Sequence, residues 1–137
     1  MAQYVVLDTN VLVSAVLARH DNSAPVQILT KIMEGTVTLL LSREILAEYN
    51  EVLRRKKFSF AETDIANIIN TLMIGCVIIE PESTGETIAD AKDLPFYEML
   101  MDSRCKGAFL ITGNTKHFPQ NFYIVTPRQM LDIILQQ

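Results

Sequence analysis

The chain has 137 residues, of which 49% are hydrophobic and 20% are charged. This composition excludes a disordered, collagen-like or linker-rich chain, and the length predicts one folded domain over residues 1–137, because two independent cores would need more chain. Because 16 Asp and Glu residues outnumber 12 Lys and Arg residues, the net charge of −4 excludes a protein that binds polyanions through a global positive field.

Short apolar runs alternate with segments that carry apolar residues at helical spacing, which predicts an α/β fold with a parallel sheet. The first run is apolar throughout, as expected of a central strand buried on both faces. In chain order we expect a strand at residues 4–7, helices at 11–17 and 25–35, a strand at 37–41, helices at 42–57 and 59–75, a strand at 76–79, a helix at 95–104, strands at 108–111 and 123–125, and a last helix from residue 126.

Capping residues set the expected helix boundaries. Ser42 precedes the third helix, and the spacing of Ser59 and Glu62 is that of a capping box before the fourth. Thr126 opens the last helix in the same way. Residues 54–57 are all basic and fall in the last turn of the expected third helix, where we favour complementation of the helix dipole over a role in holding phosphates.

The cysteines and the apolar runs bear on location. Cys76 and Cys105 lie far apart without metal-ligand or disulfide-framework spacing, which favours a reducing cytoplasm. No basic residue precedes Arg19, and the longest uncharged run, residues 65–79, is shorter than the roughly 18 apolar residues of a spanning helix. We therefore expect a cytoplasmic chain with neither a signal peptide nor a membrane anchor.

Polar residues gather where the predicted strands end. Asp8 follows the first strand directly, Asn114 follows the fourth, and Asp93 precedes a helix that begins near the same edge. Ligands of open parallel sheets bind at this edge, outside the carboxyl ends of the strands. Each of these residues taken alone is also an ordinary cap or turn residue, but their coincidence at one edge favours a site.

Glu48 lies inside the third predicted helix, where capping cannot explain an acidic residue. On a helical wheel it falls at the margin of the apolar arc, one turn from Ile45 and Val52, so its carboxylate can reach inward. The alternative is a boundary carboxylate that reaches water or pairs with a basic neighbour.

Three carboxylates in one pocket would repel one another unless a cation balanced them. Mg²⁺ and Mn²⁺ take oxygen ligands, bridge to substrate phosphate and activate water for attack at phosphorus. We therefore predict metal-dependent phosphodiester hydrolysis, with Asp8, Glu48 and Asp93 as catalytic metal ligands and Asn114 assisting. A bound ion would reconcile an acidic protein with a polyanionic substrate.

Four segments in this order resemble the PIN-domain family and, within it, the VapC-like toxins of toxin–antitoxin pairs. They are VVLDTNVLVSA at residues 5–15, SREILAEYNEVL at 42–53, DAKDLPF at 90–96 and LITGNTKHF at 110–118. The resemblance covers nearly the whole chain. It implies a three-layer α/β/α sandwich with four to five parallel strands, a metal-dependent ribonuclease activity, homodimers and a cognate antitoxin.

Carried over by position, Asp8, Glu48 and Asp93 match the three principal acidic residues of the family. Asn114 stands where many relatives have a fourth Asp, and the weaker amide ligand puts a second tightly held metal ion in doubt. Asp90 matches a further acidic position of the family's loop, and we expect it outside the set of metal ligands.

Four residues that flank the acidic positions are expected to contact substrate: Thr9, Asn10, Thr112 and Lys116. His117 carries less weight, because a lone His in a turn is more often structural or solvated than catalytic. The leading hypothesis is an endoribonuclease that uses Mg²⁺ or Mn²⁺ and acts as the toxin of a type II pair.

Two alternatives remain open. A PIN-like binding module would keep the pocket but act through protein or RNA partners, and the departure at Asn114 motivates this alternative. A phosphate-switch domain of receiver type would need an Asp at the end of its third strand, where this chain has Glu80. The high apolar fraction adds an expectation of a homodimer or higher homo-oligomer.

Overall fold

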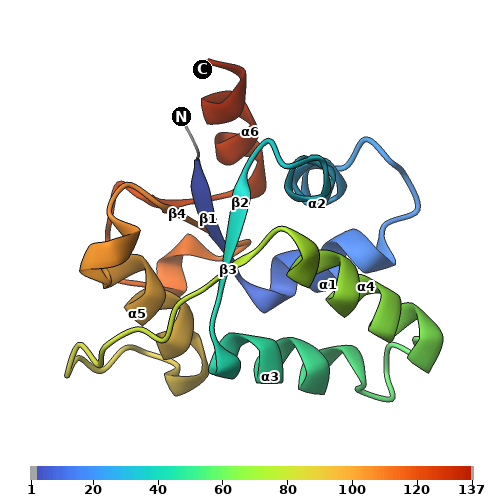
Figure 1. The fold of residues 1–137 in the computed structure, drawn as a ribbon, viewed down its shortest axis with the longest axis horizontal. Helices are drawn as coiled ribbons and strands as arrows, with labels where there is room; N and C mark the ends of the chain where they lie inside the picture. Colours follow the sequence, from blue (N-terminus) through green and yellow to red (C-terminus); the bar gives the residue numbers. More distant parts are fainter. Residues whose placement is uncertain (1–2, 137) are drawn as a thin grey trace.

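The computed structural model describes residues 3–136 (Figure 1). Five strands are present in this range: β1 (Tyr4–Leu7), β2 (Thr38–Leu41), β3 (Val77–Ile78), β4 (Phe109–Ile111) and β5 (Ile124–Val125). The helices are α1 (Thr9–Leu17), α2 (Ala24–Glu34), α3 (Arg43–Leu53), α4 (Glu62–Ile74), α5 (Leu94–Met101) and α6 (Pro127–Leu135), with short 3₁₀ helices η1 (Ala91–Asp93), η2 (Ser103–Cys105) and η3 (Thr115–His117).

The strands form one parallel sheet in the order β3-β2-β1-β4-β5, so the predicted α/β fold is confirmed. β1 is the middle strand of this order, and its residues Val5, Val6 and Leu7 are almost wholly buried between two layers of helices. β3 lies at the edge and is shorter than the predicted strand at residues 76–79. It pairs only with the last two residues of β2, and both of its side chains are exposed.

Helices cover both faces of the sheet, so the three-layer arrangement is confirmed. In Figure 1, α5 lies on one side of the strands, α1, α2 and α4 lie on the other, and α3 runs beneath their carboxyl ends. The buried side chains of Ile45, Tyr49 and Leu53 dock α3 onto the core. The Tyr49 hydroxyl donates a hydrogen bond to the carbonyl oxygen of Leu7, which ties α3 to the end of β1.

Two of the predicted caps are present. The Ser42 hydroxyl accepts a hydrogen bond of 3.2 Å from the backbone N–H of Ile45 at the start of α3. Thr126 and Gln129 form the capping box of α6, each side chain bonding the backbone of the other residue. These caps could be predicted because donor and acceptor lie three residues apart.

Two predicted boundaries of the third and fourth helices are wrong. α3 ends at Leu53 rather than near Lys57, because the chain turns so that the stacked rings of Phe58 and Phe60, 5.5 Å apart, pack against the core. The residue at the N-cap position of α4 is Ala61, with no side-chain cap. Ser59, at a φ of 55°, donates instead to the carbonyl of Lys56, so the predicted capping box does not form.

The helix predicted at residues 95–104 also ends early, at Met101. Asp102 takes an extended conformation and caps η2, because its carboxylate accepts the backbone N–H of Arg104 at 3.0 Å. None of the helices between residues 3 and 136 is long and apolar enough to cross a bilayer.

Candidate active site

Asp8 stands at the carboxyl end of β1, directly before α1. Its backbone N–H donates to the carbonyl of Ile111 at 2.9 Å, which holds it against the end of β4. Its Oδ2 atom accepts a hydrogen bond of 2.7 Å from the Thr112 hydroxyl. With 6% of its surface exposed, Asp8 is a buried acid, and Thr112 is the one side chain among residues 3–136 that donates to it.

Burial raises the pKa of Asp8 to about 6. The negative charges of Asp93 and Glu48 add to this rise, whereas the hydrogen bond from Thr112 opposes it. An acid in such surroundings carries its charge at a cost at neutral pH, and a nearby cation would remove that cost.

Asp93 and Glu48 approach Asp8 from two other elements. Glu48 is half-buried on α3, and Asp93 is the last residue of η1. Burial raises the pKa of Asp93, and the charges of Asp90 and Glu48 raise it further, whereas His117 lowers it. The Oδ2 atom of Asp93 is buried and accepts no hydrogen bond from residues 3–136. The fold thus gathers three acids that feel one another's charge.

Capping does not account for these polar residues. Asp8, Asp93 and Asn114 occupy the N-cap positions of α1, α5 and η3, yet none of the three side chains makes a capping hydrogen bond. The hydroxyls of Ser42 and Thr126 do cap their helices. The cap positions left without a capping side chain therefore include three of the four residues predicted to be catalytic.

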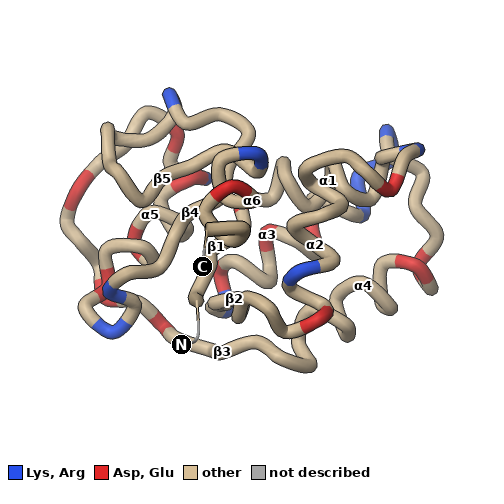
Figure 2. Tube along the Cα trace, turned by 90° about the horizontal axis from the view of Figure 1, so that it is seen from above, with Lys and Arg blue, Asp and Glu red and all other residues tan. Residues whose placement is uncertain are grey.

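One cavity of about 480 Å³ brings the three acids together, and Asp90 lines it with them. Cations line the same cavity: Arg55, Lys57 and Lys92. Figure 2 shows Lys and Arg at several separate points of the trace, with a group of them close together at the end of the molecule near α1.

The position of Arg55 and Lys57 overturns the interpretation of residues 54–57 as a dipole complement. α3 has no basic residue in its last turn, and the two cations follow its end and face the cavity. Two further lining residues, Phe58 and Lys92, were missed in the sequence. The adjacency of Lys92 to Asp93 was the only signal that could have found it.

The structure separates the predicted substrate contacts. Thr9 and Asn10 line the cavity, whereas Lys116 lines a separate depression beside Phe118. Thr112 is wholly buried and does not line the cavity; its hydroxyl donates to Asp8. His117, which sequence reasoning ranked below Lys116, lines the cavity.

Asn114 lies beside the cavity rather than in its lining. Its backbone N–H donates to the Thr112 hydroxyl at 3.1 Å, and its side-chain nitrogen lies 2.8 Å from Nε2 of His117. It therefore contacts two residues that adjoin the acids, while its own amide is occupied by His117.

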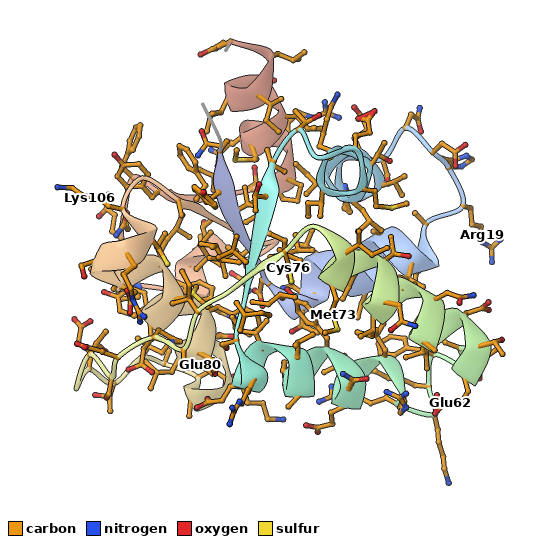
Figure 3. All side chains as sticks on the ribbon, viewed as in Figure 1. Arg19, Glu62, Met73, Cys76, Glu80 and Lys106 are labelled. Atoms are coloured by element: carbon orange, nitrogen blue, oxygen red, sulfur yellow. The ribbon has the colours of Figure 1, made fainter. Side chains whose placement is uncertain are left out.

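Glu80, which argues against a receiver-type domain, has a structural role. Its two carboxylate oxygens accept the backbone N–H of Arg43 at 3.0 and 3.1 Å, and Figure 3 places its label beside the start of α3. Glu80 therefore caps α3 from 37 residues away in the sequence. This contact could not be predicted from the sequence, because it depends on the path of the loop after β3.

The donor set fits a hard divalent cation in its chemistry. Carboxylate oxygens are the preferred ligands of Mg²⁺ and Mn²⁺, and two buried oxygens of the site, Asp93 Oδ2 and Thr9 Oγ1, have no partner among residues 3–136. Within that range no three His, Cys, Asp or Glu side chains converge closely enough to enclose an ion as they stand. Coordination would therefore draw the carboxylates closer together.

Comparison with known proteins places the chain in a family. The structure of VapBC2 from Rickettsia felis bound to a DNA fragment from their promoter is similar in fold, with a TM-score of 0.55 and 20% identity over 83% of this chain and 90% of that chain. No curated protein matches the chain. The family model of the PIN domain matches residues 4–116, a range that includes β1 to β4 and all three acids. The chain therefore belongs to the PIN-domain family.

Proposed function

We propose that this protein is a divalent-metal-dependent endoribonuclease that hydrolyses RNA phosphodiester bonds. The proposal rests above all on Asp8, a buried acid whose pKa is raised to about 6 by burial and by neighbouring carboxylates. None of the cations in residues 3–136 forms an ion pair with it. Membership of the PIN-domain family supports the same conclusion.

Asp8, Glu48 and Asp93 would hold Mg²⁺ or Mn²⁺ through their carboxylate oxygens. When bound, the ion supplies neutralisation of phosphate charge and activation of a water molecule. Thr112 keeps Asp8 oriented by its hydrogen bond, and Thr9 lies in the cavity beside it.

The cationic lining supports a polyanionic substrate. Arg55, Lys57 and Lys92 share the cavity with the acids, so they can contact phosphates on either side of the bond that is cleaved. The net charge of −4 makes this local lining, together with the ion, the means by which RNA would be held.

Cleavage of single-stranded RNA by the purified protein in Mg²⁺ or Mn²⁺ tests the proposal. Asp8→Asn is expected to lower the cleavage rate by about 10³-fold, the scale of losing one group that positions a catalytic metal ion. Glu44→Gln is the matched control, because Glu44 is an exposed acid in the first turn of α3. Unchanged cleavage by a folded Asp8→Asn protein would contradict the proposal.

A second candidate, a PIN-like module that binds protein or RNA without cleaving it, is favoured by two observations. Asn114 replaces a carboxylate, and no three potential ligands among residues 3–136 converge on one point. Calorimetry with Mn²⁺ separates the two functions. Binding that is lost in Asp8→Asn supports the nuclease, and no heat at millimolar Mn²⁺ supports the module.

We also propose that the chain is the toxin of a type II pair and forms homodimers in the cytoplasm. Exposed apolar side chains on α2, α4 and β3 support burial against another chain: Met33, Met73, Ile74 and Ile78. The similar structure from Rickettsia felis is titled VapBC2, which motivates an antitoxin partner. Light scattering should give twice the chain mass of 15.5 kDa, and a monomer at all concentrations would contradict the homodimer.

The antitoxin is tested separately by co-expression with the adjacent reading frame. Co-purification of its product in a stable complex that inhibits RNA cleavage is expected. A product that neither binds nor inhibits would contradict a toxin–antitoxin pair and leave the nuclease untouched.

A further inference from the structure

His117 is the one imidazole that lines the acidic cavity within residues 3–136. Its Nδ1 atom lies 3.7 Å from Oδ2 of Asp93, which is too long for a hydrogen bond. That oxygen is also one of the two buried side-chain atoms of the site that have no hydrogen-bond partner among residues 3–136. A protonated imidazole is therefore an ion-pair partner of Asp93, and the tautomer with a bare Nδ1 places a second electron-pair donor beside that oxygen.

The opposite edge of the ring is held in place. The amide nitrogen of Asn114 lies 2.8 Å from Nε2 of His117, and the backbone N–H of Asn114 donates to the Thr112 hydroxyl at 3.1 Å. Thr112 in turn donates to Asp8 at 2.7 Å. A continuous set of contacts thus links the imidazole to the most buried acid and keeps Nδ1 turned toward Asp93.

Resting on the metal-dependent function proposed above, we propose that His117 supplies Nδ1 as a nitrogen ligand of the divalent ion, beside Asp93. In this proposal Asn114 is a positioning residue for the imidazole and not itself a ligand. Neighbouring ligands of an octahedral ion lie roughly 3 Å apart when each is about 2.1 Å from it. The observed 3.7 Å needs only a small closure to reach that spacing.

The imidazole can keep its proton on Nε2 when Nδ1 binds an ion. A neutral ring carries one proton, and that proton must lie on Nε2 when Nδ1 binds a cation. The side chain of Asn114 serves both states, because its NH₂ group donates to a bare Nε2 and its oxygen accepts from Nε2–H after the amide turns over. A histidine that binds a metal ordinarily donates its other N–H to such an acceptor.

This assignment accounts for the departure at position 114. An Asn in place of a carboxylate removes one charged oxygen, and the imidazole restores a ligand without adding a fourth negative charge. A nitrogen ligand also changes the choice of ion, since imidazole suits later divalent transition metals whereas Mg²⁺ favours oxygen ligands. The site should therefore prefer Co²⁺ over Mg²⁺ more strongly with His117 than without it.

Electron spin-echo spectroscopy of the Mn²⁺-loaded protein tests the ligand directly, because a bound imidazole nitrogen modulates the echo of the ion. We expect this ¹⁴N modulation in the wild-type protein and its loss in His117→Gln. His20→Gln is the matched control, since His20 is the only other histidine and is exposed outside the cavity. Loss of the modulation in His20→Gln, or its persistence in His117→Gln, would overturn the assignment.

Calorimetry separates the roles of the two residues. His117→Gln should bind Co²⁺ about tenfold more weakly and change Mg²⁺ affinity by less than about twofold. Asn114→Ala should also weaken Co²⁺ binding by about tenfold, whereas Asn114→Asp, which keeps an oxygen acceptor for Nε2–H, should retain the ¹⁴N modulation. Unchanged Co²⁺ affinity in Asn114→Ala would overturn the positioning role.

The outcomes also distinguish this inference from the function on which it rests. Mn²⁺ that binds the wild-type protein without ¹⁴N modulation overturns the role of His117 and leaves the metal-dependent nuclease intact. No Mn²⁺ binding at millimolar concentration overturns the proposed function and the ligand together.

Discussion

Asp8 and Asp102 are two aspartates with similarly small exposed fractions, 6% and 9%, whose pKa values are shifted in opposite directions. Asp102 accepts four hydrogen bonds between 2.9 and 3.2 Å, three from Arg104 and one from the backbone of Glu82. The side chain of Arg104 is the largest cause that holds the pKa of Asp102 well below its usual range. Burial is the largest cause that raises the pKa of Asp8, the charges of Asp93 and Glu48 add to it, and the hydrogen bond from Thr112 opposes it.

The difference separates a structural acid from a functional one. Asp102 and Arg104 fasten the loop after β3, because Arg104 also donates to the carbonyl of Glu80 at 2.9 Å. The fold supplies hydrogen-bond donors to both carboxylate oxygens of Asp102. Asp8 has no such set of donors among residues 3–136, so its negative charge is not balanced by the fold. This is the state expected of a side chain that binds a cation or takes part in catalysis.

Replacing Asp8 should show this difference most strongly. Without divalent ions at pH 7.5, Asp8→Asn is expected to raise the free energy of unfolding by about 2 to 3 kcal/mol, because the rise of the Asp8 pKa from 3.8 to about 6 costs roughly 1.4 kcal/mol per unit. Asn keeps an acceptor for Thr112. Urea unfolding in a chelator measures the change.

The pH dependence supplies the control for this prediction. Because the folded pKa of Asp8 lies above its unfolded value, the wild-type protein gains stability from this residue as pH falls from about 7 through 6 toward 4. Asp8→Asn should lack that gain. Wild-type and variant curves that run parallel between pH 4.5 and 7.5 would contradict the unsatisfied state of Asp8.

Replacing Asp102 should act in the opposite direction. Asp102→Asn is expected to lower the free energy of unfolding by about 2 kcal/mol, the scale of hydrogen bonds to a charged group. The folded pKa of Asp102 is lowered, so its contribution is present above the unfolded value of 3.8 and is lost only as pH falls below it. The deficit should therefore be constant from pH 4.5 to 7.5, and a deficit that vanishes at pH 4.5 would contradict this role.

Divalent ions should stabilise the folded protein through Asp8 and not through Asp102. At a free concentration ten times the dissociation constant, Mn²⁺ is expected to add about 1.4 kcal/mol to the free energy of unfolding of the wild-type protein. Asp102→Asn should show the same increment and Asp8→Asn almost none, as measured by unfolding with and without the ion. Equal increments in all three proteins would place the ion elsewhere.

The smallest effects are expected from replacing the cations near Asp8, which are Arg55 and Lys57, and the cation beside Asp102, which is Arg104. Arg55→Ala and Lys57→Ala should each weaken RNA binding about threefold to tenfold and reduce its salt dependence, since phosphate contacts are worth roughly 1 kcal/mol. Arg104→Ala should instead lower the midpoint of thermal unfolding and leave RNA affinity unchanged. Filter binding at two salt concentrations checks this, and equal RNA affinities of all variants would contradict the cationic lining.

Local patterns predicted much of the fold. The central position of β1 follows from its unbroken apolar run, and the caps at Ser42 and Thr126 follow from short-range spacing. The early end of α3 could not be predicted, because the pattern of residues 54–57 is compatible with a helix. Packing of Phe58 and Phe60 against the core decides that boundary.

The same division holds for the candidate site. Asp8 and Asp93 could be selected because the strand ends and helix starts of a parallel sheet meet at one edge. Glu48 could be selected because an acidic residue at the margin of an apolar helix face is unusual unless it has a partner or a function. The roles of Thr112 and His117 could not be assigned, since Thr112 bonds a residue 104 positions away and His117 shares the cavity with acids from three other segments.

By itself, the sequence determined the α/β fold, the membership of the PIN-domain family and which acidic residues to examine. Only the tertiary structure decided which acid is satisfied and which is not. Asp8 and Asp102 are the same type of residue, but burial and two neighbouring carboxylates raise the pKa of Asp8, whereas hydrogen bonds from Arg104 lower that of Asp102. Charge and burial act through space, so contacts across the fold determine what each acid can do.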